Sequence, residues 1–156
     1  HNTISKYLEF LTNSYVIYPA QRYDIKGREL LTTNNKYYLV DIGLKNLIST
    51  NKYDSDLGRK LENVVYFELL RRGGKIYCGK NNDKEIDFVV QKPNNVREYY
   101  QVAYTVTDEK TLEREISAFR NIRDNYPKYL LTLDFDQANI GGIQKMNVID
   151  WLLIRE

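Results

Sequence analysis

The chain has 156 residues, the length of one compact domain or of a domain with a small appendage. Its 23 lysines and arginines exceed its 21 aspartates and glutamates by only two, which excludes a general nucleic-acid coat protein but leaves room for a local basic patch. Apolar residues make up 42% of the chain in short runs, so we expect neither disorder nor a transmembrane segment.

Two residue types that carry much enzyme chemistry are nearly absent. The only cysteine is Cys78 and the only histidine is His1, which excludes an intrachain disulfide, a multi-cysteine zinc site and histidine-based catalysis. Any catalysis must therefore use carboxylates, lysines, tyrosines or a hard metal ion. The chain starts with neither a methionine nor a signal-peptide pattern, so we expect it to be part of a longer protein, and the single cysteine fits a reducing cytoplasm.

Residues 1–50 predict the back half of a winged helix. The expected elements, in chain order, are a helix over 3–12, a strand over 15–23, a polar turn over 24–35, a strand over 36–40 and a short helix from Asp41. The turn carries the basic run Lys26-Gly27-Arg28. Helix, strand, basic turn and strand is the order found at the end of a winged helix, although the same turn can also be a plain solvated loop.

Residues 51–156 predict a mixed α/β layer. The expected elements are a helix over 55–72, strands over 75–78, 85–90 and 96–105, a helix over 107–124, strands over 128–133 and 145–149, and a short helix over 150–153. Apolar side chains at helical spacing, such as Leu61, Val65 and Leu69, predict that the helices pack on the sheet. This order indicates a sheet flanked by helices.

Three polar residues of this segment form a candidate site for a hard metal ion. Glu62 lies on the first predicted helix, Asp87 on the second strand and Gln101 on the third. Because the two strands form a hairpin, we expect Asp87 and Gln101 to meet at its open end. Mg²⁺ takes such oxygen ligands and can assist phosphodiester hydrolysis, usually beside a lysine. From the residues alone, both carboxylates can equally be solvated, with Asp87 and Glu85 on the polar face of a half-buried strand.

The segments LENVVYFELLRRG (61–73), KEIDFVV (84–90) and YYQVAYTVTDEKTLEREISAF (99–119) resemble a known family. They are similar to the restriction-endonuclease-like domain of unknown function at the C-terminus of a prokaryotic AAA+ ATPase family. Residues 3–44 are similar to the winged-helix end and connector of the same proteins. The resemblance implies a restriction-endonuclease-like mixed sheet over 51–156, preceded by a partial winged helix over 1–50. It also implies an N-terminal ATPase module that binds ATP. This chain contains no P-loop motif, so we do not expect it to bind ATP in that way itself.

The chain departs from the nuclease pattern that the resemblance implies. That pattern has a glutamate on the helix, an aspartate on the second strand and an acidic residue two positions before a lysine on the third. Glu62 and Asp87 match it, whereas Gln101 replaces the second carboxylate and Ala103 replaces the lysine. We therefore expect no cofactor in this chain, with Mg²⁺ on Asp87 as the alternative.

These observations predict a catalytically degenerate recognition module that binds DNA or a partner protein for its own ATPase module. Arg22, Lys26 and Arg28 are the expected nucleic-acid contacts. A Mg²⁺-dependent DNA endonuclease with relocated catalytic groups is one alternative. A structural module that forms a homo-oligomer through its tyrosine-rich strands is the other.

Overall fold

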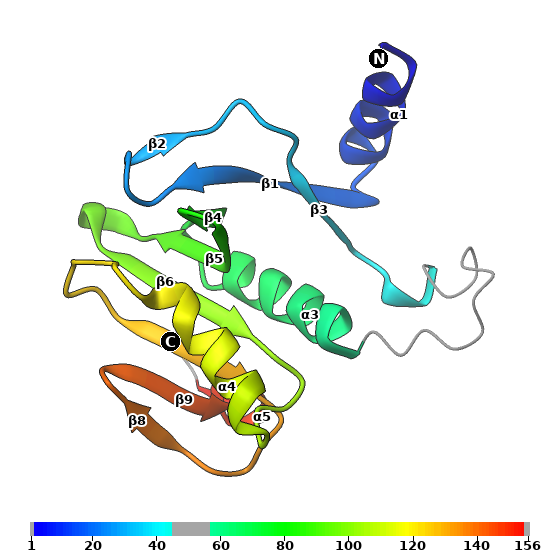
Figure 1. Cartoon of the computed structure of the whole chain (residues 1–156). Helices are drawn as coiled ribbons and strands as arrows, with labels where there is room; N and C mark the ends of the chain where they lie inside the picture. Colours follow the sequence, from blue (N-terminus) through cyan, green and yellow to red (C-terminus); the bar gives the residue numbers. More distant parts are fainter. Residues whose placement is uncertain (1, 45–56, 155–156) are drawn as a thin grey trace.

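The computed structural model describes residues 2–44 and 57–154 (Figure 1). Its helices are α1 (Asn2–Asn13), α3 (Leu57–Arg71), α4 (Glu109–Ile116) and α5 (Val148–Leu153). Its strands are β1 (Ile17–Asp24), β2 (Glu29–Leu30), β3 (Lys36–Leu39), β4 (Lys75–Asn81), β5 (Lys84–Gln91), β6 (Arg97–Val102), β7 (Lys128–Thr132), β8 (Ala138–Ile140) and β9 (Ile143–Asn147). Within these ranges, no helix has the length and apolar character that a bilayer span needs.

All nine described strands join one mixed sheet in the order β2-β1-β4-β5-β6-β7-β9-β8, with β3 paired to β1. Strands β4, β5 and β6 form an antiparallel meander, and β6, β7 and β9 run parallel to one another. Strand β1 runs parallel to β4, so the predicted winged-helix hairpin belongs to the same sheet. The predicted domain boundary at residue 50 lies outside the described residues. The prediction of a mixed sheet flanked by helices is confirmed.

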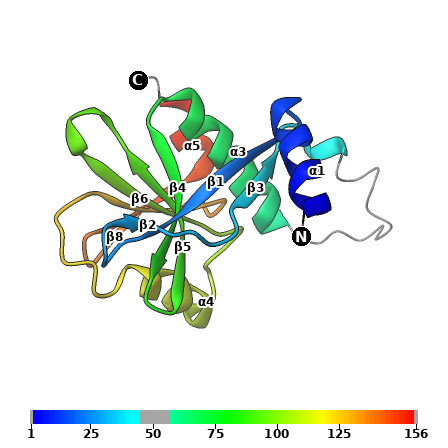
Figure 2. The ribbon, with the colours of Figure 1, turned by 90° about the horizontal axis from the view of Figure 1, so that it is seen from above.

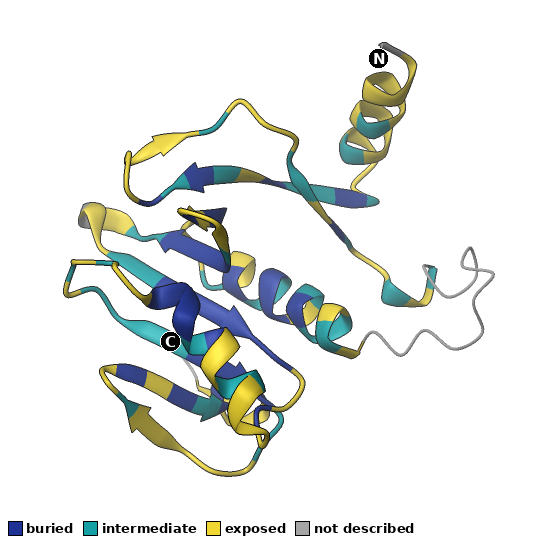
Figure 3. Cartoon of the chain, viewed as in Figure 1, coloured by how far each residue is buried: buried dark blue, intermediate teal, exposed yellow. Residues whose placement is uncertain are grey.

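The helices cover both faces of the sheet. Helices α3 and α5 lie on one face and α4 lies on the other (Figure 2). On the first face Phe88 is fully buried beside the stacked rings of Tyr38 and Tyr66, whose centroids are 4.1 Å apart. Helix α1 stands away from the sheet and is mostly exposed (Figure 3). The packed core therefore lies in the meander and its two helical layers.

Several predicted elements have different limits in the structure. Strand β2 lies within the predicted polar turn over 24–35, β8 was not predicted, and β6 is shorter than the strand predicted over 96–105. The helix predicted over 107–124 ends at Ile116 and continues only as a 3₁₀ turn over Ser117–Phe119. The Asn81 side-chain amide donates hydrogen bonds to the carbonyls of Ala118 and Arg120, which gives these groups partners outside a helix. The last strand ends earlier than predicted because Asn147 caps α5, accepting from the backbone of Ile149.

We predict that the core around Phe88 supports much of the stability. Phe88→Ala removes a fully buried ring and should lower the free energy of unfolding by about 3–5 kcal/mol. The matched control is Phe135→Ala, at a side chain that is 96% exposed, where a change within about 0.5 kcal/mol is expected. Urea unfolding measures both, and similar losses in the two variants would contradict this core.

Candidate functional site

A β-bulge shapes the centre of the candidate site. Tyr77 of β4 pairs with Val89 of β5 and Gly79 pairs with Ile86, so the single residue Cys78 lies opposite both Asp87 and Phe88. A bulge of this kind redirects side chains and is frequent beside functional sites. Here Asp87 is buried rather than on a solvated polar face, which corrects the simple alternation expected from the sequence.

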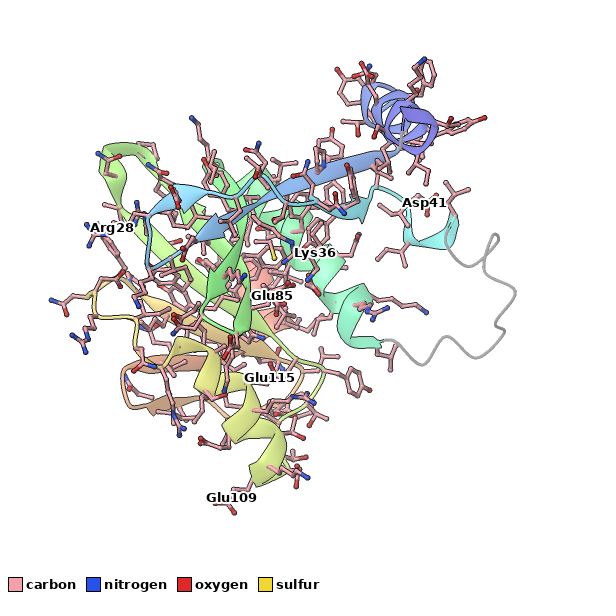
Figure 4. All side chains as sticks on the ribbon, turned by 45° about the horizontal axis from the view of Figure 1, so that its top comes forward. Arg28, Lys36, Asp41, Glu85, Glu109 and Glu115 are labelled. Carbon is pink, nitrogen blue, oxygen red and sulfur yellow. The ribbon has the colours of Figure 1, made fainter. Side chains whose placement is uncertain are left out.

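The Lys36 ammonium lies among three carboxylates at this bulge. Its Nζ is 2.7 Å from Glu62 Oε1, 2.8 Å from Glu85 Oε1 and 3.8 Å from Asp87 Oδ1. Lys36 comes from β3, Glu62 from α3, and both Glu85 and Asp87 from β5. Figure 4 shows Lys36 and Glu85 close together. One ammonium therefore links the hairpin, the helix and the meander.

Neighbouring hydrogen bonds fix the two buried carboxylates. The Tyr38 hydroxyl, two residues along β3 from Lys36, donates to Glu62 Oε1 at 2.6 Å. The backbone N–H of Val102 donates to Asp87 Oδ2 at 2.8 Å. Glu62 is thus held by a side chain of β3 and Asp87 by the backbone of β6.

Gln101 lies beside Asp87 but points its amide group to the other helix. Its Oε1 accepts from the Asp87 backbone N–H at 3.3 Å, and its Nε2 donates to Glu115 Oε2 on α4 at 2.8 Å. The structure therefore brings Glu62 and Asp87 together around Lys36. Gln101 continues the polar network toward Glu115 and does not face the ammonium.

The charges in the cluster shift the pKa values of its members. Burial and the Glu62 carboxylate raise the pKa of Asp87 to about 8. Burial alone would lower the pKa of Lys36, but the carboxylates of Glu62 and Asp87 outweigh it and raise that pKa. Hydrogen bonds from Lys36 and Arg22 overcome burial and lower the pKa of Glu85 to about 2. With a proton on Asp87, the ionised carboxylates of Glu62 and Glu85 balance the charges of Lys36 and Arg22.

The three predicted nucleic-acid contacts lie in two different environments. The Arg22 guanidinium forms an ion pair with Glu85 at 2.6 Å and also donates to the Asn34 carbonyl. Lys26 and Arg28 are exposed in the turn between β1 and β2. Figure 4 shows Arg28 apart from Lys36 and Glu85. Arg22 therefore belongs to the carboxylate cluster, and only Lys26 and Arg28 remain available on the turn.

Sequence reasoning missed three members of this network, namely Lys36, Tyr38 and Glu115. Lys36 and Tyr38 are two residues apart, so strand alternation alone could have placed them on one face. Their proximity to Glu62 depends on the pairing of β3 with β1 and of β1 with β4, which no local pattern reveals. Ala103, which stands where the nuclease pattern has a lysine, is buried among apolar side chains.

Glu62 and Asp87, as they are arranged, do not fit Mg²⁺. Among residues 2–44 and 57–154, no group of three or more His, Cys, Asp or Glu side chains is placed to hold one. The two carboxylates of the predicted site, Glu62 and Asp87, share the Lys36 ammonium. Mg²⁺ requires oxygen ligands at about 2.1 Å in an octahedron, and a cation between the ligands opposes it.

The chain is similar to a bacterial protein and to an archaeal protein. A protein of Haemophilus influenzae described as uncharacterized is 41% identical over 154 residues, which cover 98% of this chain and 37% of that protein. A protein of Methanocaldococcus jannaschii with the same description is 29% identical over 151 residues, or 94% of this chain and 32% of that protein. The chain thus spans about a third of the length of these relatives. No family model and no solved structure matches it.

We predict that Asp87 makes stability fall as the pH rises. The folded carboxyl keeps its proton up to a pKa of about 8, whereas an unfolded aspartate loses it near ~3.9. The folded state therefore binds more protons between these values, and the stabilisation by this proton is lost across that window. Asp87→Asn keeps the neutral form, so its stability relative to wild type should increase from pH 5 to pH 8.

Urea unfolding at the two pH values measures this difference. The control is Asp83→Asn in the exposed β4–β5 turn, whose stability relative to wild type should be the same at both. If Asp87→Asn instead loses stability relative to wild type at pH 8, Asp87 is ionised there and is held by Lys36.

Proposed function

We propose that this chain is the nucleic-acid-recognition module of a longer protein, built on a restriction-endonuclease-like scaffold that has lost strand cleavage. In this proposal the Lys36 ammonium occupies the position of a catalytic metal ion. It is an internal cation that the scaffold keeps for stability. The alternative ligand of the same module, a partner protein, is an outcome of the tests below.

The observation that carries this proposal is the set of contacts made by Lys36. Its ammonium lies within ion-pair distance of Glu62, Glu85 and Asp87, which include both carboxylates of the nuclease pattern. A divalent ion at the same place would be repelled by this ammonium and would need the ion pairs to break. The replacement of the third-strand acid by Gln101 removes a further negative ligand.

The exposed turn between β1 and β2 supports nucleic-acid binding. Lys26 and Arg28 form no ion pair with any described residue, so both are available to a phosphate. The nearly balanced net charge of the chain restricts the contact to a small basic region. Such contacts give sequence-independent affinities of about 10⁻⁴ to 10⁻⁶ M at physiological salt.

The lengths of the relatives support a module within a longer protein, because this chain matches about a third of each. The ATP-binding AAA+ module that the sequence resemblance implies would lie in the remainder. We also propose that the protein is cytoplasmic and can form a homo-oligomer.

A metal-dependent endonuclease is the second candidate, favoured by the 3.8 Å distance between Lys36 Nζ and Asp87 Oδ1. In that reading Lys36 supplies, from another strand, the lysine that is missing at Ala103. The two candidates differ in what the carboxylates bind when a divalent ion is offered.

We predict that the wild-type chain has no Mg²⁺ or Mn²⁺ site tighter than about millimolar, because the ion must displace Lys36. Lys36→Met removes the ammonium and frees Glu62 and Asp87, so this variant should gain affinity for Mn²⁺ in calorimetry. Lys75→Met, at the exposed start of β4, is the control and should behave as wild type. A micromolar wild-type site lost in Asp87→Ala, with cleavage of duplex DNA in Mg²⁺, would establish the endonuclease instead.

We also predict weak, salt-dependent binding to duplex DNA. Each cation on a phosphate releases about one counterion, so Lys26→Ala/Arg28→Ala should reduce the slope of log K against log salt by ~2. Fluorescence anisotropy at several salt concentrations measures the slope. The control is Lys75→Ala, which removes a positive charge outside the β1–β2 turn and should leave the slope unchanged. Absence of binding by wild type at low salt would contradict the proposal and leave a partner protein as the ligand.

A further inference from the structure

A cavity lies apart from the carboxylate cluster, at the turn between β1 and β2. It has a volume of about 510 Å³ and is formed by three segments that are distant in sequence: the β1–β2 turn, the β4–β5 turn and the loop after α4. Its polar lining includes Lys26, Arg28, Asn82, Asn121, Arg123 and Asp124. Ile25 and Ile122 add apolar contacts. A volume of this size suits a small ligand.

The cavity carries positive charge that the described part of the chain does not neutralise. Lys26, Arg28 and Arg123 make no ion pair there, whereas many other lysines and arginines of the described residues do. The single carboxylate of the lining, Asp124, accepts a hydrogen bond from the Tyr99 hydroxyl at 2.6 Å and lies 3.5 Å from Lys128 Nζ. The cavity is therefore suited to an anionic ligand.

The walls of the cavity are held by specific backbone and side-chain features. The buried Asn81 joins the β4–β5 turn to the loop after α4 through its two hydrogen bonds to Ala118 and Arg120. Arg28, Asn82 and Asn121 have positive φ values of 57°, 55° and 69°, which non-glycine residues seldom adopt. One such residue comes from each of the three walls. Such conformations persist where the surrounding structure fixes them.

We infer that this cavity binds the phosphate monoester of a nucleotide, with Arg123, Lys26 and Arg28 around the phosphate. Three cations suit a dianionic terminal phosphate, and arginines bind phosphate oxygens in pairs. The amides of Asn82 and Asn121 offer hydrogen bonds to the sugar or base, and the isoleucines offer an apolar surface. This inference deepens the proposed function and rests on it, because the nucleotide is assigned to the phosphorylated end of a nucleic-acid strand. A free mononucleotide has the same chemistry.

The test compares two fluorescent single-stranded oligonucleotides that differ only in a 5′-phosphate or 5′-hydroxyl end. Anisotropy should show the phosphorylated strand binding about tenfold more tightly to wild type. Arg123→Ala should remove this preference, because it deletes one of the phosphate ligands and is not part of the β1–β2 turn. Lys75→Ala should keep it. Arg123→Gln, which retains the length and polarity of the side chain, guards against a misfolded loop, and thermal unfolding checks each variant.

The outcomes separate this inference from the proposed function. Equal binding of both strands, with salt dependence retained, overturns the phosphate-end pocket and leaves nucleic-acid recognition standing. A preference that survives in both Arg123 variants overturns the pocket as well. If neither strand binds but adenosine monophosphate binds to wild type more tightly than to Arg123→Gln, the cavity is a mononucleotide site and the recognition proposal fails. Binding of none of these probes overturns both.

Discussion

The ion pairs of Lys36 are the constraint on which the centre of this molecule depends. Moving a charged group out of water costs several kcal/mol, and a buried carboxylate is stable only when it is paired, hydrogen-bonded or protonated. Glu62 uses Lys36 and Tyr38, and Asp87 uses the Val102 N–H and a raised pKa. Since the carboxylates lie on α3 and β5 and their partners on β3 and β6, satisfying the carboxylates requires these four elements to assemble together.

The bulge in β5 gives this cluster its geometry. With one residue, Cys78, opposite two, the strand turns Ile86 and Phe88 into cores on opposite faces of the sheet. Asp87 between them reaches both the Lys36 ammonium and the backbone of β6. Cys78 itself is fully buried, and burial raises its pKa to about 12, so its thiol is a structural apolar group. A regular strand would have directed Asp87 to one face only.

Local patterns in the sequence were sufficient for most of the elements but not for the site. Apolar spacing predicted α3 and the meander, and hairpin logic placed Asp87 near Gln101, as the hydrogen bond between them shows. The helix after residue 107 was predicted too long because its end is fixed by Asn81, a contact across 37 residues. Lys36 escaped prediction for the same reason. Its role arises from strand pairing between distant segments, which residue types and spacing do not encode.

The cations of β1, β3 and the β1–β2 turn have two different roles. Arg22 pairs with the half-buried Glu85 and Lys36 with the buried Glu62, whereas Lys26 and Arg28 remain available to an anion. The central claim is that Lys36 holds the position that a metal ion would need. Anomalous diffraction from crystals soaked in Mn²⁺ tests it most directly. Our account predicts no manganese peak between Glu62 and Asp87, with the Lys36 ammonium still against Glu62. A manganese ion bound by both carboxylates, with Lys36 displaced, would contradict it.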